Sequence, residues 1–243
     1  MQINNYKNSI SFSSLNCPIK PFKIRTSKGN LYCSEIDYSK SYKKCFYKNI
    51  GEFFLDIFAN TSSHPFWKKC RKPTLEKDVY DDYIESSIKD YKKYFKDRDT
   101  TVILIKNSSQ KLVGAIYSRV MDLGKHLRDK DTLYIDGLAV SQEYRGMNVG
   151  KKLLLKVLDS SKERFSDVFL VAYKESTPFY EKLKFKKMDT NDSAQKYAIK
   201  KLADERIDYP QYVDFMQKDF NQKRTKKWYE RIDKKYINKQ FYK

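Results

Sequence analysis

The chain has 243 residues, with 50 lysines and arginines against 31 aspartates and glutamates, and its formal net charge is +19 at pH 7. This length allows one domain with appendages or two small domains, and 40% hydrophobic residues suffice for a sizeable core. No run approaches the roughly 18 to 20 apolar residues of a membrane span, and we expect no secretion signal in the polar start of the chain.

The positive charge would attract nucleic acid, a ribosome or another anionic surface, and it would also favour a polyanionic ligand. A lysine-rich source genome would produce the same excess, so charge alone does not separate these alternatives. The cysteines show no CxxC spacing, and only His64 and His126 could join them, so we expect no metal site and no disulfide framework. Reduced thiols in the cytoplasm are the better interpretation. The four cysteines are Cys17, Cys33, Cys45 and Cys70.

The first half of the chain alternates short strands with amphipathic helices. Residues 1–20 are polar and irregular, which predicts a loose arm. Two β-type runs, 18–27 and 31–37, flank a turn and predict a hairpin. Apolar residues at helical spacing predict helices over 48–59 and 75–95, and strands are predicted over 101–105 and 111–120. Between the helices, Phe66 and Trp67 would form a lid if exposed; packing against the core is the favoured alternative.

The second half contains the most informative stretch. Thr132–Val140 is apolar on both faces, which predicts a buried strand, and a tight turn leads into a helix over 151–159. A hydrophobic strand follows over 167–173, and a short helix then begins, with Thr177 as its cap and Pro178 in its first turn. The runs 184–188 and 195–200 predict a closing hairpin. From 207 to 243 the pattern is helical and basic.

The turn before the helix has the properties of a phosphate-binding loop. Gly146 and Gly150 leave the backbone bare, and Asn148 tolerates left-handed geometry, so successive N–H groups can face one concavity. Such a nest at a helix N-terminus attracts phosphate, because unpaired donors and the positive end of the helix dipole coincide there. The loop matches neither the GxxxxGK[ST] nor the GxGxxG pattern. A glycine-containing connection without a ligand is the alternative.

Arg145 to Gly150 resembles the acyl-coenzyme A signature of the GNAT N-acetyltransferase superfamily, [Q/R]-x-x-G-x-[G/A], with Asn148 at its middle glycine. Leu138-Ala139-Val140 matches the L-x-V that ends the family's fourth strand. The stretch from Phe179 to Phe185 resembles the family's x-Y-E-K-L-G-F, with lysine in place of glycine at 184. The resemblance covers about residues 132–188.

The resemblance implies an α/β (α+β) fold, in which a mixed, mostly antiparallel central sheet is flanked by helices. We expect this GNAT-like domain over residues 21–200, followed by a basic helical C-terminal extension over 201–243. The implied reaction transfers an acetyl group from acetyl-CoA, the co-substrate, to a primary amine without a metal. The acceptor stays open: an antibiotic, a polyamine, a protein N-terminus and a lysine all fit.

The resemblance also implies roles for individual residues. Backbone groups of Leu138, Ala139 and Val140 would pair with the pantetheine arm, and an N–H there would serve the oxyanion. Tyr180 would protonate the leaving thiolate, and Asp136 would act as the general base. Their alternatives are a core tyrosine and a structural carboxylate. The residues expected to hold the pyrophosphate are Arg145, Gly146, Met147, Asn148, Val149, Gly150 and Lys151.

Two other functions remain open at this point. The first is a GNAT fold that binds CoA or a partner without catalysis, suggested by Asn148, by Lys184 and by Tyr173, which stands where relatives often have asparagine. The second is a nucleic-acid- or ribosome-associated protein, suggested by the charge and by the basic tail.

Overall fold

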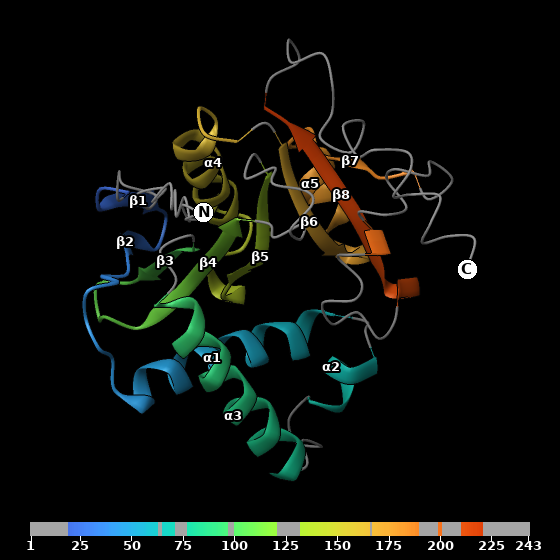
Figure 1. Ribbon diagram of the computed structural model, residues 1–243. Helices are drawn as coiled ribbons and strands as arrows, with labels where there is room; N and C mark the ends of the chain where they lie inside the picture. Colours follow the sequence, from blue (N-terminus) through green and yellow to red (C-terminus); the bar gives the residue numbers. More distant parts are fainter. Residues whose placement is uncertain are drawn as a thin grey trace, which may run out of the picture.

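In the computed structural model of the protein, a single sheet runs through the centre of the molecule (Figure 1). The structure describes residues 19–62, 65–70, 77–96, 100–120, 132–165, 167–189, 199–200 and 210–220. Within these ranges the sheet has eight strands in the order β1-β2-β3-β4-β5-β6-β8-β7. Only β5 and β6 are parallel among the described neighbouring pairs, so the predicted mixed, mostly antiparallel sheet is confirmed. The strands are β1 (Phe22–Thr26), β2 (Gly29–Glu35), β3 (Thr100–Lys106), β4 (Leu112–Val120), β5 (Thr132–Val140), β6 (Asp167–Tyr173), β7 (Lys186–Lys187) and β8 (Val213–Asp219).

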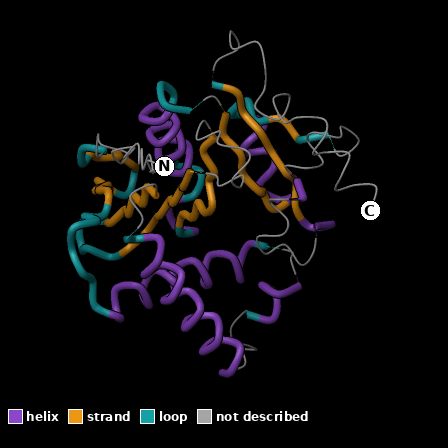
Figure 2. The backbone as a smooth tube through the Cα atoms, viewed as in Figure 1, coloured by secondary structure: helices purple, strands orange, loops and turns teal. Residues whose placement is uncertain are grey.

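Helices lie on both sides of the sheet (Figure 2). Buried residues of α1 and α3 pack with strand residues such as Val102 and Ala139 on one face, whereas α4 and α5 pack on the other face. In α4, Leu153, Leu154 and Val157 are almost fully buried, and each contributes about 1.5 to 3 kcal/mol by leaving water. The described helices are α1 (Lys44–Thr61), α2 (Pro65–Lys69), α3 (Lys77–Tyr94), α4 (Val149–Ser161) and α5 (Thr177–Glu181).

β5 is covered on both faces, as its continuous apolar pattern predicts. Leu133 and Ile135 belong to the core beneath α4, whereas Ala139 belongs to the core beneath α1 and α3. A regular strand would place these three odd-numbered residues on one face, and the extra residue of a β-bulge between Ile135 and Gly137 moves Ala139 to the other. A strand buried in this way gives the neighbouring loop a rigid base.

The predictions for the C-terminal part need correction. The chain was expected to be helical from 207 to 243, but Val213–Asp219 form strand β8, which pairs with β6 over seven residues. Tertiary pairing overrides local helical preference in such a segment. The expected hairpin between 184–188 and 195–200 is wrong where the structure describes it: Lys186 and Lys187 pair with β8, and residues 199–200 are helical. Residues 195–198, 201–209 and 221–243 lie outside the described ranges, as do residues 1–18 of the expected arm. Ile19, the next residue of that arm, is buried.

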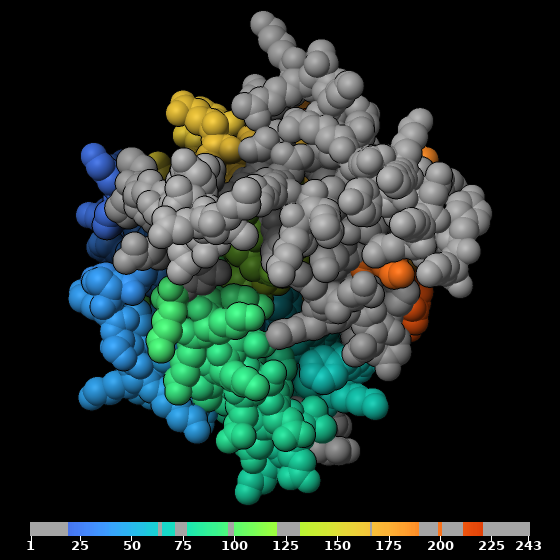
Figure 3. Space-filling model, in the orientation of Figure 1, coloured from blue at the N-terminus to red at the C-terminus, as the bar shows by residue number. Residues whose placement is uncertain are grey.

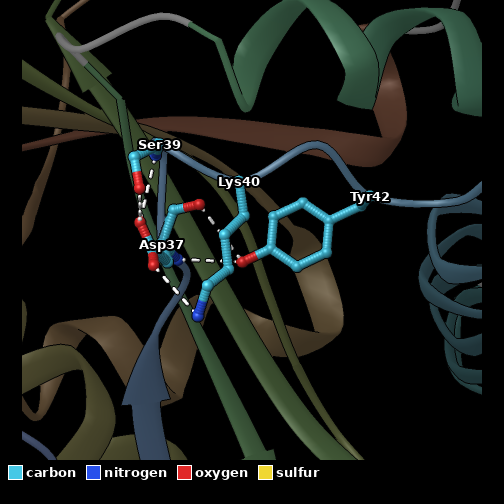
Figure 4. A network of polar contacts seen from close by, with 4 residues as sticks. All are labelled: Asp37, Ser39, Lys40 and Tyr42. Atoms are coloured by element: carbon cyan, nitrogen blue, oxygen red, sulfur yellow. Dashed lines mark hydrogen bonds and ion pairs between the residues drawn. The ribbon is translucent and has the colours of Figure 1, made fainter.

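A polar network fixes the connection from β2 to α1 (Figure 4). The Asp37 carboxylate accepts hydrogen bonds from the Ser39 hydroxyl at 2.6 Å and the Ser39 amide at 3.0 Å, and it pairs with Lys40 at 3.1 Å. The Tyr42 hydroxyl accepts a hydrogen bond from the Asp37 amide at 2.9 Å. The bonds from Ser39 are the main reason that the pKa of Asp37 is lowered. The network sets the direction in which the chain enters α1, which has no side-chain cap of its own.

Candidate active site

The parallel strands β5 and β6 separate halfway along their length. Their pairing runs from Thr132 opposite Asp167 to Ile135 opposite Leu170 and then stops. β5 continues to Val140, still paired with β4, and β6 continues to Tyr173, still paired with β8. Beyond Ile135, the edge of β5 that faces β6 therefore has no strand partner within the described residues. Backbone groups on such an edge can accept an extended ligand, as in β-strand addition.

A β-bulge lies where the two strands part. Tyr117 of β4 faces Gly137 and Ser118 faces Ile135, so Asp136 is an extra residue on β5. A bulge increases local twist and redirects a side chain, and bulges are common beside active sites. Gly137 allows the Tyr117 ring to lie directly on the strand, because a Cβ at that position would overlap the ring. The bulge thus places Asp136 at the mouth of the opening.

Asp136 forms an ion pair that the sequence did not reveal. Its Oδ2 accepts a hydrogen bond from Arg119 Nε at 3.1 Å, and the two side chains are only 19% and 18% exposed. The Arg119 guanidinium also lies over the Tyr134 ring at 5.1 Å from its centroid. The ion pair fixes the orientation of the carboxylate within the strand region. Arg119 lies near the end of an ordinary strand in the sequence, and only the register of β4 against β5 brings it to Asp136.

The loop before α4 has the backbone geometry of a nest. Gly146 and Asn148 have φ angles of 76° and 59°, both in the left-handed region. Asn148 is the N-cap of α4 and makes no side-chain cap hydrogen bond. The amides of Val149, Gly150 and Lys151 have no acceptor among the described residues, as expected for the first turn of a helix. These donors and the helix dipole favour an anion at this position.

The loop, the end of β5 and α5 meet at one place. A Cβ built on Gly150 would lie 3.5 Å from Val140 Cγ2 and 3.7 Å from Phe179 Cζ. Met147, Leu138 and Val140 pack against the same core cluster as Phe179. Arg145 Nε donates a hydrogen bond to the Val140 carbonyl at 3.2 Å, which ties the loop to the strand.

Each sequence-predicted site residue therefore has a definite place. Leu138, Val140 and the loop from Arg145 to Gly150 lie together, Lys151 is exposed on the first turn of α4, and Ala139 faces the opposite core. The predicted contact of Ala139 would therefore be made by its backbone.

Tyr180 is a buried phenol on the short helix α5. It is 8% exposed, and its ring lies edge-on to Phe179 and Phe185 at centroid distances of 5.0 and 5.8 Å. Its hydroxyl makes no hydrogen bond to any described residue, and burial raises its pKa, so the phenol stays neutral at physiological pH. The predicted capping role of Thr177 is wrong: its hydroxyl donates instead to Asp214 Oδ2 of β8 at 2.6 Å.

A cavity of about 580 Å³ opens beside the separated strands. Tyr180, Asp136 and Leu138 line it, together with residues of β6 and of the helices α1, α2 and α3. Trp67 is packed, at 9% exposure, with its indole N–H bonded to the Tyr173 hydroxyl, whereas Phe66 is 37% exposed; both line this cavity. The predicted packing of Trp67 against the core is thus confirmed, and Trp67 also lines the cavity.

The remaining features of the described residues do not contribute to this site. A second cavity of about 620 Å³ lies beside the β3–β4 turn and is lined by none of the residues that the sequence singled out for the site. Within the described ranges, no group of three or more metal-binding side chains is close enough to hold a metal ion. In the same part of the chain, no helix has the length and apolar character needed to cross a membrane.

Comparison with known proteins bears on the family and the fold. Residues 67–185 match the family model described as Acetyltransferase (GNAT) family. The fold is similar to that of an acetyltransferase of the GNAT family from Staphylococcus aureus Mu50, with 20% identity, a TM-score of 0.50, and coverage of 78% of this chain and 99% of that one. It is also similar to a protein of Pyrococcus horikoshii OT3, with 16% identity, a TM-score of 0.51 and the same coverage of 78% and 99%. No curated protein sequence gives a significant match.

Proposed function

The chain carries a domain of the GNAT acetyltransferase family, and from this premise we propose that it transfers an acetyl group from acetyl-CoA to the primary amine of an acceptor. The observation that carries the proposal is the opening between β5 and β6, with the nest before α4 on one side and the Tyr180 hydroxyl on the other. An acetyl transfer needs a bound thioester, an oxyanion donor and a stabilised leaving group.

In this proposal the co-substrate is held by the backbone. The free edge of β5 from Leu138 to Val140 pairs with the pantetheine arm, and an N–H there faces the carbonyl oxygen where negative charge develops. The loop from Arg145 to Lys151 binds the pyrophosphate, with Arg145 adding charge to the amides of the first helical turn.

The two departures from the family signature do not weaken this assignment. Asn148 and Lys184 stand where the family has glycine, and their φ angles are 59° and 68°. Both residues thus adopt a left-handed backbone conformation of the kind that glycine adopts readily. The loop keeps its shape, which removes one of the reasons to prefer a binding module without catalysis.

The acceptor nitrogen attacks the thioester carbonyl carbon, a C–N bond forms, and the C–S bond breaks as the thiolate leaves. The proton of the amine passes to Asp136, directly or through a water molecule, and the ion pair with Arg119 orients that carboxylate. The Tyr180 hydroxyl donates to the departing sulfur. A purely structural Asp136 would leave the pH dependence of kcat/KM unchanged when it is replaced by asparagine.

Calorimetric titration with acetyl-CoA tests the binding step. Gly150→Asp places charge and bulk against the pyrophosphate, so the folded variant should lose binding. Ser160→Asp, which adds the same charge near the other end of α4, is the matched control and should bind normally. Unchanged affinity in Gly150→Asp would remove the phosphate assignment. Binding without thiol release across a panel of amines would instead favour a binding module.

A further inference from the structure

The cavity beside β5 has walls that are unusual for this chain. Aromatic residues make up half of its described lining, and they come from α1, α2, α3, α5 and the central strands. The charged residues in that lining are Asp90 of α3 and Asp136 of β5, and it contains no lysine or arginine. The whole chain has 50 lysines and arginines, so a lining with carboxylates alone is distinctive.

The aromatic residues form a connected set around Tyr117. Its ring meets Phe54 edge-on at 5.5 Å and Tyr91 edge-on at 6.1 Å, and it stacks on Tyr94 at 6.2 Å between centroids. Burial raises the pKa of Tyr91 and Tyr117 well above the usual value, so these phenols are neutral. Neutral aromatic rings attract a cation through their faces, and they give an apolar body a matching surface.

The charges of the cavity favour an acceptor of one sign. An ammonium ion meets aromatic rings and the Asp90 carboxylate, whereas a carboxylate or phosphate on the acceptor would meet no basic side chain in the described lining. Arg119 is near, but it and Asp136 form an ion pair in which each offsets the charge of the other, so Asp90 decides the sign of the cavity. Removing an anion from water without a partner is costly, so acceptors that carry one are discriminated against.

We propose that the acceptor is a small organic amine with an apolar or aromatic body and no carboxylate or phosphate, and that Asp90 helps to select it. This inference rests on the proposed acetyltransferase function and narrows its substrate. The amine enters as the ammonium ion, held by the aromatic walls and by Asp90. It loses its proton near Asp136, where Tyr180 projects into the same cavity.

Matched pairs of acceptors test the proposal on the full-length protein. Phenethylamine and phenylalanine, agmatine and arginine, and 1,5-diaminopentane and lysine differ within each pair by one α-carboxylate. Thiol release at saturating acetyl-CoA gives kcat/KM for each compound. We expect the decarboxylated member to be preferred by about 100-fold or more in every pair that is turned over, since an unpaired buried charge is the penalty.

Variants of α3, which lies at the molecular surface in Figure 3, separate specificity from structure. Asp90→Asn should raise KM for the amine about 10-fold with little change in kcat. It should also lower the ratio of kcat/KM for the amine to kcat/KM for the matching amino acid. Asp82→Asn, on the same helix but exposed and outside the cavity lining, should change neither quantity. A merely structural Asp90 would leave the ratio unchanged.

Three results would overturn the inference while the acetyltransferase function stands: a preference for the amino acids, no turnover of any pair by protein that releases thiol with another amine, or an unchanged ratio in Asp90→Asn. Failure to bind acetyl-CoA at all would count against the proposed function instead.

Discussion

Replacement of Tyr180 by phenylalanine tests the catalytic proposal most directly. The change removes one hydroxyl and keeps the edge-on contacts with Phe179 and Phe185. Because that hydroxyl has no hydrogen-bond partner among the described residues, we expect the free energy of unfolding to stay the same or to rise by up to about 1 kcal/mol. Loss of stability is therefore not expected to explain any loss of activity.

The size of the effect on rate follows from the pKa of the phenol. General acid catalysis is typically worth about 10²- to 10⁴-fold, or about 2.7 to 5.4 kcal/mol in activation free energy. Burial raises the pKa of Tyr180, whereas an unperturbed thiol has a pKa of about 8.5. Complete proton transfer to the thiolate is thus uphill, and the phenol acts mainly as a hydrogen-bond donor. We therefore expect a fall in kcat near the lower end, about 10²-fold.

The assay follows free thiol release at saturating amine, with single-turnover measurements to establish that chemistry limits the rate. The KM for acetyl-CoA should change little, because the hydroxyl acts mainly in the transition state. Tyr47→Phe is the control: Tyr47 is a buried tyrosine of α1 that lines neither cavity, and its replacement should leave kcat unchanged. If kcat of Tyr180→Phe stays within two-fold of the parent, Tyr180 is a packing residue and solvent protonates the thiolate.

Lys184→Gly should raise the free energy of unfolding by about 0.5 to 1 kcal/mol, because lysine at 184 has a left-handed backbone conformation that glycine adopts more easily. Lys182→Gly, at a position with a right-handed backbone, should lower the free energy of unfolding, and thermal denaturation measures both variants. Burial raises the pKa of the Cys33 thiol to about 12, so at pH 9 a thiol reagent should label exposed Cys45 and spare Cys33 in peptide maps. Unfolded Cys33 ionises near pH 8.5, so its contribution to stability should be complete below that pH and disappear as the pH rises towards 12. Truncation after Gln222 should leave acetyl-CoA affinity within a few-fold, whereas truncation after residue 200 removes β8 and should unfold the protein, as circular dichroism would show.

Local signals in the sequence predicted the core of the site. The strand Thr132–Val140 was predicted with the bounds that β5 has, because a continuous apolar run between polar turns is a strong signal for a buried strand. The predicted helices 48–59 and 75–95 correspond to α1 and α3, with shifts at the ends where helices fray. The left-handed geometry at Asn148 could also be anticipated, because asparagine is among the few residues that tolerate it.

Features that depend on pairing between distant segments could not be predicted. The ion pair of Arg119 with Asp136 requires the register of β4 against β5, including the bulge. The aromatic cavity requires α3 to cross β4 so that Tyr91 and Tyr117 meet. Neither feature has a sequence pattern of its own. Arg119 and Asp136 lie on different strands, 17 residues apart. The tyrosines of the cavity do not stand out, because the chain has 20 tyrosines.

The strand that the sequence missed also bears on where the GNAT-like domain ends. Asp214 of β8 accepts the hydrogen bond of the Thr177 hydroxyl at the start of α5 and pairs with Lys187 of β7 at 3.0 Å. α5 carries Tyr180, so the position of that phenol depends on a strand beyond both the family match at residues 67–185 and the predicted boundary at 200. β8 also separates β6 from β7 and completes the sheet on the far side of the opening. We therefore propose that the domain extends at least to Asp219, and that only the residues after β8 form an appendage.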